Sequence, residues 1–330
     1  MSGAAESRPA PQQPAPCSVA WDNAGASALG TAPVASFWVA LEQNGPWGRD
    51  VATQSRLDPE VGVVLERNCR EAGGRFILIR RPGAHPDRHG DGHQRAYLAG
   101  GLGARPWLLQ ADLKNATQLL RLPWAALNEG RLAGLQDTMP ELERSRASML
   151  LVCTNSQRDL CCAVRGRPVA LESSARRPGQ VWECSHTGGH RFAPTGVLLP
   201  HGQTFARLSG PSAVRAIDAA TQDEVPAELL GTAYDRGRSH LTPPAQAAES
   251  VVRQQIEEVN LLALSTTAAP QPGRDHTWHC RVSHVDGRHW DVVAERESGG
   301  EHRPQSCGKG PMPTWQWSVR SNEMLSGAGP

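Results

Sequence analysis

Two pairs of metal-binding residue types stand close together near the middle of this 330-residue chain. Eight residues separate Cys153 from Cys162, and a Thr-Gly-Gly sequence separates His186 from His190. Each pair follows a β-like run, so both are expected on loops at strand ends. Cysteine thiolates and imidazoles in such a set bind either zinc or the iron of an iron–sulfur cluster. The fold must therefore bring two separate loops together around a metal.

The spacing within the pairs favours the larger of these two cofactors. Zinc loops usually separate their cysteines by roughly two to four residues, fewer than lie between Cys153 and Cys162. The two glycines between the histidines permit positive φ angles and a close approach of backbone to a bulky group. A [2Fe-2S] cluster bound by two cysteines and two histidines has a precedent in Rieske centres. The residues thus predict an electron-transfer protein, with a structural Cys2His2 zinc protein as the alternative.

The pairs lie in LLVCTNSQRDLCCAVRGRPVA (Leu150 to Ala170) and VWECSHTGGHRFAPTGVLLPHGQTFARL (Val181 to Leu208). Together with 30–33, 46–48, 76–83, 236–249 and 306–309, these segments resemble the sucrase/ferredoxin-like family. The resemblance implies a thioredoxin-like ferredoxin with a [2Fe-2S] cluster, whose ligands here are Cys153, Cys162, His186 and His190. Cys161, beside Cys162, is the less favoured substitute. The chain shows no paired-carboxylate motif for the sugar chemistry in the family's name.

The expected ligand set has consequences for redox behaviour. Replacing two thiolates by two imidazoles raises the reduction potential, and each ligating imidazole keeps a second nitrogen that can exchange a proton. By analogy with Rieske centres, we assign Cys153 and Cys162 to one iron and His186 and His190 to the other. We expect an electron carrier rather than an enzyme, served by a redox partner protein. A thioredoxin-like thiol oxidoreductase is a further alternative, although the chain lacks C-x-x-C.

Composition argues against several other classes of protein. The net charge of +1 gives no basic excess for nucleic acid, and no stretch approaches 18 apolar residues. Residues 1–16 have neither the basic nor the apolar region of a secretory signal. We therefore expect a cytoplasmic protein without a membrane span.

The pattern along the chain predicts four regions of an α/β protein. These are a disordered N-terminus (1–16), an α/β lobe (17–145), the thioredoxin-like ferredoxin domain (146–230), and a C-terminal α+β module with a flexible end (231–330). Periodicity predicts strands at 36–41, 75–80, 95–99, 107–111, 148–153, 180–184, 197–199, 204–208, 261–264, 276–282 and 290–294. It predicts helices at 59–72, 116–127 with a break near Pro123, 162–175, 212–222 and 242–259.

The remaining cysteines and histidines have plainer interpretations. Cys17, Cys69, Cys184, Cys280 and Cys307 show no regular spacing and are expected as small buried side chains or inert thiols. Cys17 and Cys307 lie in family-like segments without an assigned role, and Cys184 would point to the same side of an extended segment as His186. The histidines of two groups are expected as solvated or surface residues: His85, His89 and His93, and His276, His279, His284 and His289.

Overall fold

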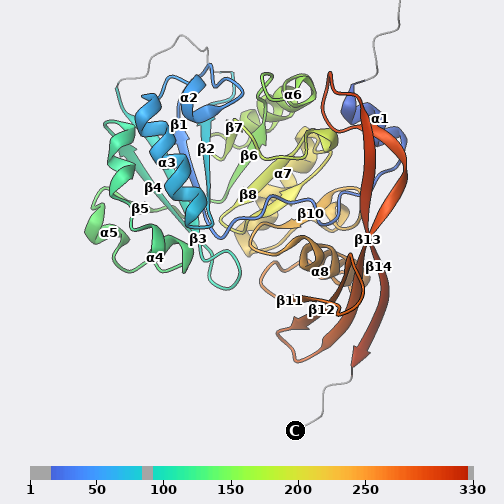
Figure 1. The fold of residues 1–330 in the computed structure, drawn as a ribbon. Coiled ribbons are helices and arrows are strands. Elements are labelled where there is room, and N and C mark those ends of the chain that lie inside the picture. Colours follow the sequence, from blue (N-terminus) through green and yellow to red (C-terminus); the bar gives the residue numbers. More distant parts are fainter. Residues whose placement is uncertain (1–15, 84–91, 326–330) are drawn as a thin grey trace, which may run out of the picture.

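The computed structural model describes residues 16–83 and 92–325, and the side chains up to residue 320. The expected disordered N-terminus falls almost wholly outside these ranges, as do His85 and His89. The described chain is a mixed α/β structure with two sheets (Figure 1). Ten strands form a mixed sheet in the order β10-β9-β8-β6-β7-β2-β1-β3-β4-β5, and four antiparallel strands form a second sheet in the order β11-β12-β13-β14.

The ten-stranded sheet contains two groups of four strands with the same order and directions. Its strands are β1 (Trp38–Glu42), β2 (Arg75–Arg80), β3 (Gln94–Gly100), β4 (Trp107–Leu113), β5 (Glu143–Arg144), β6 (Met149–Cys153), β7 (Val181–Cys184), β8 (Gly196–Leu199), β9 (Gln203–Phe205) and β10 (Asp235–Arg238). In the first group β1 is parallel to β2 and antiparallel to β3, which is antiparallel to β4. The second group repeats these relations: β6 is parallel to β7 and antiparallel to β8, which is antiparallel to β9.

The two groups meet where β2 and β7 pair antiparallel, with Ile79 opposite Cys184 and Arg80 opposite Glu183. The Arg80 guanidinium lies 2.6 Å from the Glu183 carboxylate in a buried ion pair. Thr154, the residue after β6, donates a 2.8 Å hydrogen bond to the same carboxylate. The first group of strands therefore holds the loop that follows Cys153.

Helices cover both parts of the sheet. They are α1 (Cys17–Asn23), α2 (Val51–Gln54), α3 (Pro59–Glu71), α4 (Trp124–Asn128), α5 (Leu135–Thr138), α6 (Leu160–Arg176), α7 (Gly210–Ala219) and α8 (Pro243–Gln255), with 3-10 turns η1 (Ala116–Arg121), η2 (His190–Phe192), η3 (Ala220–Gln222) and η4 (Ala227–Leu229). Successive side chains of a strand point to opposite faces. Thus Leu150 and Val152 of β6 pack in a core with residues of α6 and α7. Leu151 and Cys153 instead join a core that continues to Trp38 and Ile77 of the first group.

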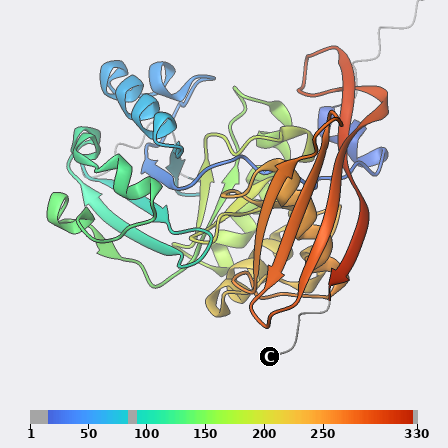
Figure 2. The same cartoon turned by 60° about the horizontal axis from the view of Figure 1, so that its bottom comes forward.

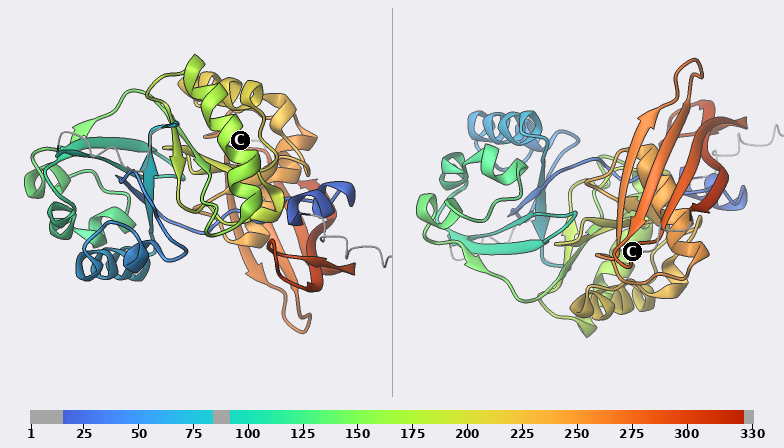
Figure 3. Two further views of the ribbon diagram at one scale, coloured as in Figure 1. Left: turned by 90° about the horizontal axis from the view of Figure 1, so that it is seen from above. Right: turned by 90° about the horizontal axis from the view of Figure 1, so that it is seen from below.

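The second sheet consists of β11 (Leu264–Pro270), β12 (Thr277–His284), β13 (His289–Pro304) and β14 (Pro311–Leu325). It packs over α8 through Val252, Trp290 and Val292 (Figure 2). The long β13–β14 hairpin continues beyond this sheet to α1, and the two views of Figure 3 show α1 beside it. The Trp21 indole of α1 donates a 2.9 Å hydrogen bond to the carbonyl of Pro304 in β13. Helix α1 thus lies beside the tip of the hairpin, whereas the described chain ends at Leu325, which pairs with His289 at the other end of that hairpin.

Most of the predicted elements are present, including the break at Pro123 between η1 and α4. Two expectations about the C-terminal region are wrong. The strand expected at 261–264 begins only at Leu264, because the Asn260 side chain accepts a hydrogen bond from the Leu262 N–H in a turn. The helix expected to reach residue 259 ends at Gln255, and Glu257 has a φ of 53°. Strand β14 extends as far as Leu325, and the flexible end expected for the C-terminal module stays a prediction.

The sheet itself runs through the boundaries that we expect at residues 146 and 231. Strands β2 and β7 pair across the first boundary, and β9 and β10 pair across the second. The division into regions remains a prediction.

Candidate metal centre

Two parallel strands deliver Cys153 and the histidine loop of the expected site to one edge of the sheet. Cys153 ends β6 and lies opposite Cys184, which ends β7. His186 follows Cys184 by two residues. Parallel neighbours end at the same edge, so the register places both cysteines and the start of the histidine loop side by side.

Helix α6 supplies the second cysteine of the pair. Asp159 is the N-cap, where its carboxylate accepts a 2.9 Å hydrogen bond from the Cys161 N–H. Cys161 and Cys162 therefore lie in the first helical turn, where the helix dipole favours thiolates. Gly166 permits this helix to rest on β6, because a Cβ at that position would come within 2.3 Å of the Cys153 carbonyl oxygen.

The histidine loop needs both of its glycines. Gly188 and Gly189 have φ angles of 73° and 68°, a region that side chains other than glycine rarely adopt, as the sequence predicts. A Cβ at Gly189 would lie 2.4 Å from the guanidinium of Arg236. That buried guanidinium donates 3.1 Å hydrogen bonds to the Gly188 carbonyl and to the Thr31 hydroxyl. The loop is thus held against a positive charge.

The four expected ligands come together in one place. The side chains of Cys162, Cys184 and His186 all interact with the Cys153 thiol and, in that order of importance, lower its pKa, although burial opposes them. The neighbouring Cys153 thiolate, together with burial, raises the pKa of Cys162. The rings of His186 and His190 lie 6.0 Å apart. Thiolate and thiol therefore face two imidazoles.

Both imidazoles present an unused nitrogen. The Nδ1 atoms of His186 and His190 are buried and accept or donate no hydrogen bond in the described structure. Burial lowers the pKa of His190, which favours the neutral ring that ligates metals. Buried polar atoms usually have a partner, so two such atoms beside cysteine thiols fit a bound metal group.

Cys161 belongs to a different group of side chains, on another side of α6. Its Sγ lies 3.5 Å from Cys17 Sγ and 3.1 Å from Cys307 Sγ, and the Cys17 and Cys307 sulfurs lie 3.6 Å apart. The donor atoms of these three cysteines and of Asp159 all lie within 4.8 Å of one another. This group, which we call the tri-cysteine group, can hold a metal ion.

Asp159 ties the segments of the tri-cysteine group together. Its carboxylate accepts hydrogen bonds of 2.7 Å from the Cys307 N–H and 2.8 Å from the Ser306 hydroxyl. Burial alone would raise the pKa of Asp159, but these bonds and the Cys161 N–H outweigh it and lower the pKa. Hydrogen bonding by Cys17 is the main cause that lowers the pKa of Cys161 to about 5. Two adjoining buried groups are thus anionic at neutral pH.

Comparison with known proteins identifies the family. The family model described as sucrase/ferredoxin-like matches residues 29–230, more than half of the chain. The chain belongs to the sucrase/ferredoxin-like family. No curated protein and no solved structure was found to match it. Among the residues that the structure describes, no helix has the length and apolar character needed to cross a membrane.

The matched range of this sucrase/ferredoxin-like chain includes all four expected ligands but not Cys17 or Cys307. It includes Thr31, which contacts Arg236 behind the histidine loop. Sequence reasoning missed the tri-cysteine group because its members come from three distant segments. The one available signal was that Cys17 and Cys307 lie in segments that resemble the family.

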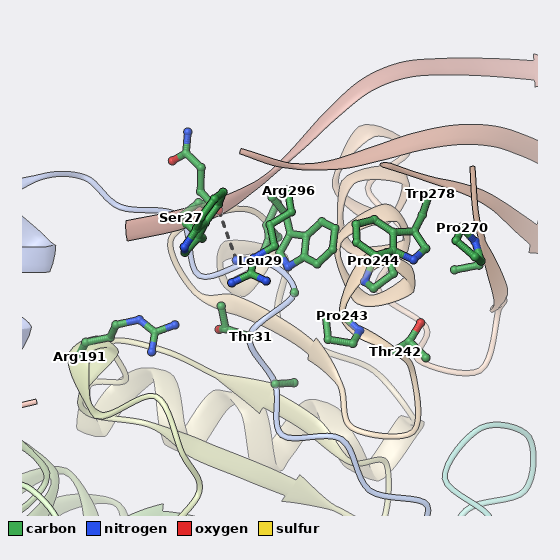
Figure 4. A pocket seen from close by; sticks show the side chains of 16 residues that line it. Ser27, Leu29, Thr31, Arg191, Thr242, Pro243, Pro244, Pro270, Trp278 and Arg296 are labelled. Carbon is green, nitrogen blue, oxygen red and sulfur yellow. Dashed lines mark hydrogen bonds between the residues drawn. The ribbon is translucent and has the colours of Figure 1, made fainter. Parts of the chain in front are cut away.

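A pocket of about 720 Å³ opens beside the histidine loop of this family member (Figure 4). Its walls carry aromatic rings of Trp278, Trp315 and Trp317 and the guanidinium groups of Arg191 and Arg296. The Arg296 guanidinium lies 4.9 Å from the Trp315 ring centre, in a cation–π contact. Arg191 follows His190 directly in the chain, so the pocket reaches the neighbourhood of the expected ligands.

Proposed function

We propose that this protein is an electron carrier with one [2Fe-2S] cluster, bound by Cys153 and Cys162 on one iron and by His186 and His190 on the other. The observation that carries the proposal is the convergence of these four side chains from two separate loops, with two buried imidazole nitrogens lacking partners. When bound, such a cluster accepts and releases one electron at a potential above that of an all-cysteine cluster.

The surrounding fold supports this assignment. The order β9-β8-β6-β7, with α6 between β6 and β7 and β8 antiparallel to its neighbours, is compatible with a thioredoxin-like ferredoxin domain. The ligands occupy the edge of the sheet at which β6 and β7 end. We propose this layout for the matched family region as part of the same hypothesis.

The chain's own residues prepare the site for a metal cluster. Cys162, Cys184 and His186 stabilise the Cys153 thiolate. The Arg236 guanidinium lies close enough to Cys153 for the two charges to attract, and this attraction raises the pKa of Arg236 against the effect of burial. Burial is the main cause that lowers the pKa of Arg236 to about 9, so the group stays cationic at neutral pH. One fixed positive charge thus partly balances the Cys153 thiolate in a region of low dielectric.

The cysteines and histidines differ in their access to solvent. Cys153 and Cys162 are each 1% exposed, whereas the His190 side chain is 22% exposed. Electron exchange between proteins is expected through the accessible edge of a cofactor. We therefore propose that a redox partner protein docks over the histidine loop.

Metal and sulfide analysis separates this function from the structural zinc alternative. Protein purified without oxygen is expected to be reddish-brown and to contain about two irons and two acid-labile sulfides per chain. Cys153→Ser should remove both, while Cys69→Ser, a buried cysteine of α3, is the control that should retain them. A colourless protein that binds only zinc after reconstitution with iron and sulfide would exclude the proposed function.

A further inference from the structure

The geometry points to a second metal site, a structural zinc ion bound by the thiolates of Cys17, Cys161 and Cys307 and the carboxylate of Asp159. This site joins α1, the start of α6 and the tip of the β13–β14 hairpin. It is independent of the proposed cluster, since it shares none of the cluster's ligands.

The sulfur–sulfur distances fit a single ion. Zinc that binds tetrahedral thiolates at about 2.3 Å holds their sulfur atoms about 3.8 Å apart. The three sulfur pairs of this group lie at 3.1, 3.5 and 3.6 Å, so shifts of up to about 0.7 Å complete that geometry. Cysteines that bind different irons of one cluster lie farther apart than cysteines on one ion. The group is therefore too compact for a multi-iron cluster.

The charges of the group call for a cation. Three thiol sulfurs and a carboxylate oxygen lie within 4.8 Å of one another, and all of these side chains except that of Cys307 are buried. Thiols bind zinc as thiolates, and such neighbouring anionic donors repel one another strongly in a low dielectric unless a cation lies between them. Asp159 also lies 3.9 Å from the imidazole of His190, a ligand of the proposed cluster. The guanidinium of Arg191 stacks on the rings of Trp21 and Phe192, at 4.9 and 4.7 Å, and also interacts electrostatically with Cys17. It supplies a single positive charge near the group. A divalent ion compensates the thiolates and the carboxylate directly.

The donor types select among the possible metals. Three thiolates favour zinc, copper(I) or iron, and a carboxylate oxygen is a common zinc ligand but a poor partner for soft copper(I). Zinc also binds more tightly than iron(II) in the usual order of divalent affinities. A disulfide explains this arrangement less well than a bound metal does. It would join only two of three nearly equidistant sulfurs and leave the third thiol beside Asp159.

The site has a clear structural consequence. Residue Cys17 begins α1 and Cys307 lies between β13 and β14, so their sequence separation is 290 residues. The site borders the proposed cluster through the adjacent Cys161 and Cys162 and through Asp159, which also lies near His190. Zinc would therefore fasten α1 and the tip of the β13–β14 hairpin to the start of α6, the helix that supplies Cys162.

Metal analysis of matched variants tests this site. Wild-type full-length protein is expected to contain about one zinc per chain, and Cys17→Ser or Cys307→Ser should reduce it at least tenfold while iron and sulfide remain. Cys280→Ser, in β12 and remote from both groups, is the control and should keep its zinc. Unchanged zinc in the Cys17 and Cys307 variants, or a stoichiometric disulfide among the three cysteines without zinc, would overturn the inference.

Two further measurements keep the test decisive. If a variant fails to fold, wild-type protein loaded with cobalt(II) should show the thiolate-to-cobalt charge-transfer absorption of a thiolate site, and absence of that band counts against the site. If the cluster proposal fails and both sites bind zinc, Cys307→Ser should lose one zinc and Cys153→Ser the other. The two proposals can therefore fail separately.

Discussion

The two cysteine groups at the start of α6 differ in how the chain assembles them. Cys153, Cys162, His186 and His190 come from one β-α-β unit and the loop that follows it. The tri-cysteine group draws on α1, α6 and the β13–β14 hairpin. The first group is thus a product of local topology, whereas the second depends on the packing of the whole molecule.

Adjacent residues serve the two groups because of helix geometry. Successive residues of an α-helix point about 100° apart, so Cys161 and Cys162 face different surroundings. Cys162 contacts Cys153, whereas Cys161 contacts Cys17 and Cys307. One helical turn can therefore support two metal sites of different composition.

The largest expected effect separates these neighbours. Cys162→Ser should abolish the visible absorption of the proposed cluster, because serine is a poor ligand for iron and Cys161 faces Cys17 and Cys307 instead. Cys161→Ser should keep most of the absorption but lose the zinc. Visible spectra and metal analysis of both variants provide the measurement. The opposite pattern, with bleaching only in Cys161→Ser, would show that Cys161 and not Cys162 binds the cluster.

The next effect concerns the stability of α1 and of the β13–β14 hairpin tip. Cys307→Ser should lower the free energy of unfolding by roughly 3 kcal/mol, since a lost structural metal is among the larger effects of single substitutions. For a chain of this size that corresponds to roughly 4 °C in Tm. Hydrogen exchange should become faster at α1 and at the hairpin tip. Equal acceleration throughout the ten-stranded sheet would argue against a local fastening role.

A smaller effect tests the histidine ligands. His190→Cys should lower the reduction potential by on the order of 100 mV, because an anionic thiolate replaces a neutral imidazole on one iron. His279→Cys, which places a thiol at an exposed position of β12, is the control and should not change the potential. Voltammetry of the three proteins makes the comparison. Equal potentials in wild type and His190→Cys would show that His190 does not ligate iron.

The smallest effect concerns the charge behind the histidine loop. Arg236→Gln should lower the potential by on the order of 50 mV, since removal of a positive charge disfavours the more negative reduced state. Arg236→Lys retains that charge and should shift the potential less. If both variants shift it equally, loop geometry rather than charge explains the role of Arg236.

Much of the first group could be predicted from the sequence. The apolar runs that predict β6 and β7 end at or next to Cys153 and Cys184, and paired glycines fix the turn between the histidines. The predicted strand at 75–80 coincides with β2. Each of these patterns lies within a few residues of the side chains that it positions. The convergence of the four side chains therefore follows once β6 and β7 pair.

The tri-cysteine group and the long hairpin could not be predicted in this way. Beyond residue 294, β13 alternates between intermediate and exposed side chains, so its sequence lacks the apolar alternation that marks a half-buried strand. Without that hairpin, nothing in the sequence brings Cys307 near Cys17. Cys184 lies between these two cases. Its two-residue spacing from His186 predicted that both side chains point to the same side of an extended segment, and both contact Cys153 in the structure.

Metal and sulfide content of the full-length protein, purified without oxygen, tests the central claim that two different metal sites flank the start of α6. The account predicts about two irons, two sulfides and one zinc per chain. It also predicts loss of iron and sulfide alone in Cys153→Ser, and loss of zinc alone in Cys17→Ser. Wild-type protein that contains zinc but no sulfide, even after reconstitution with iron and sulfide, would contradict it.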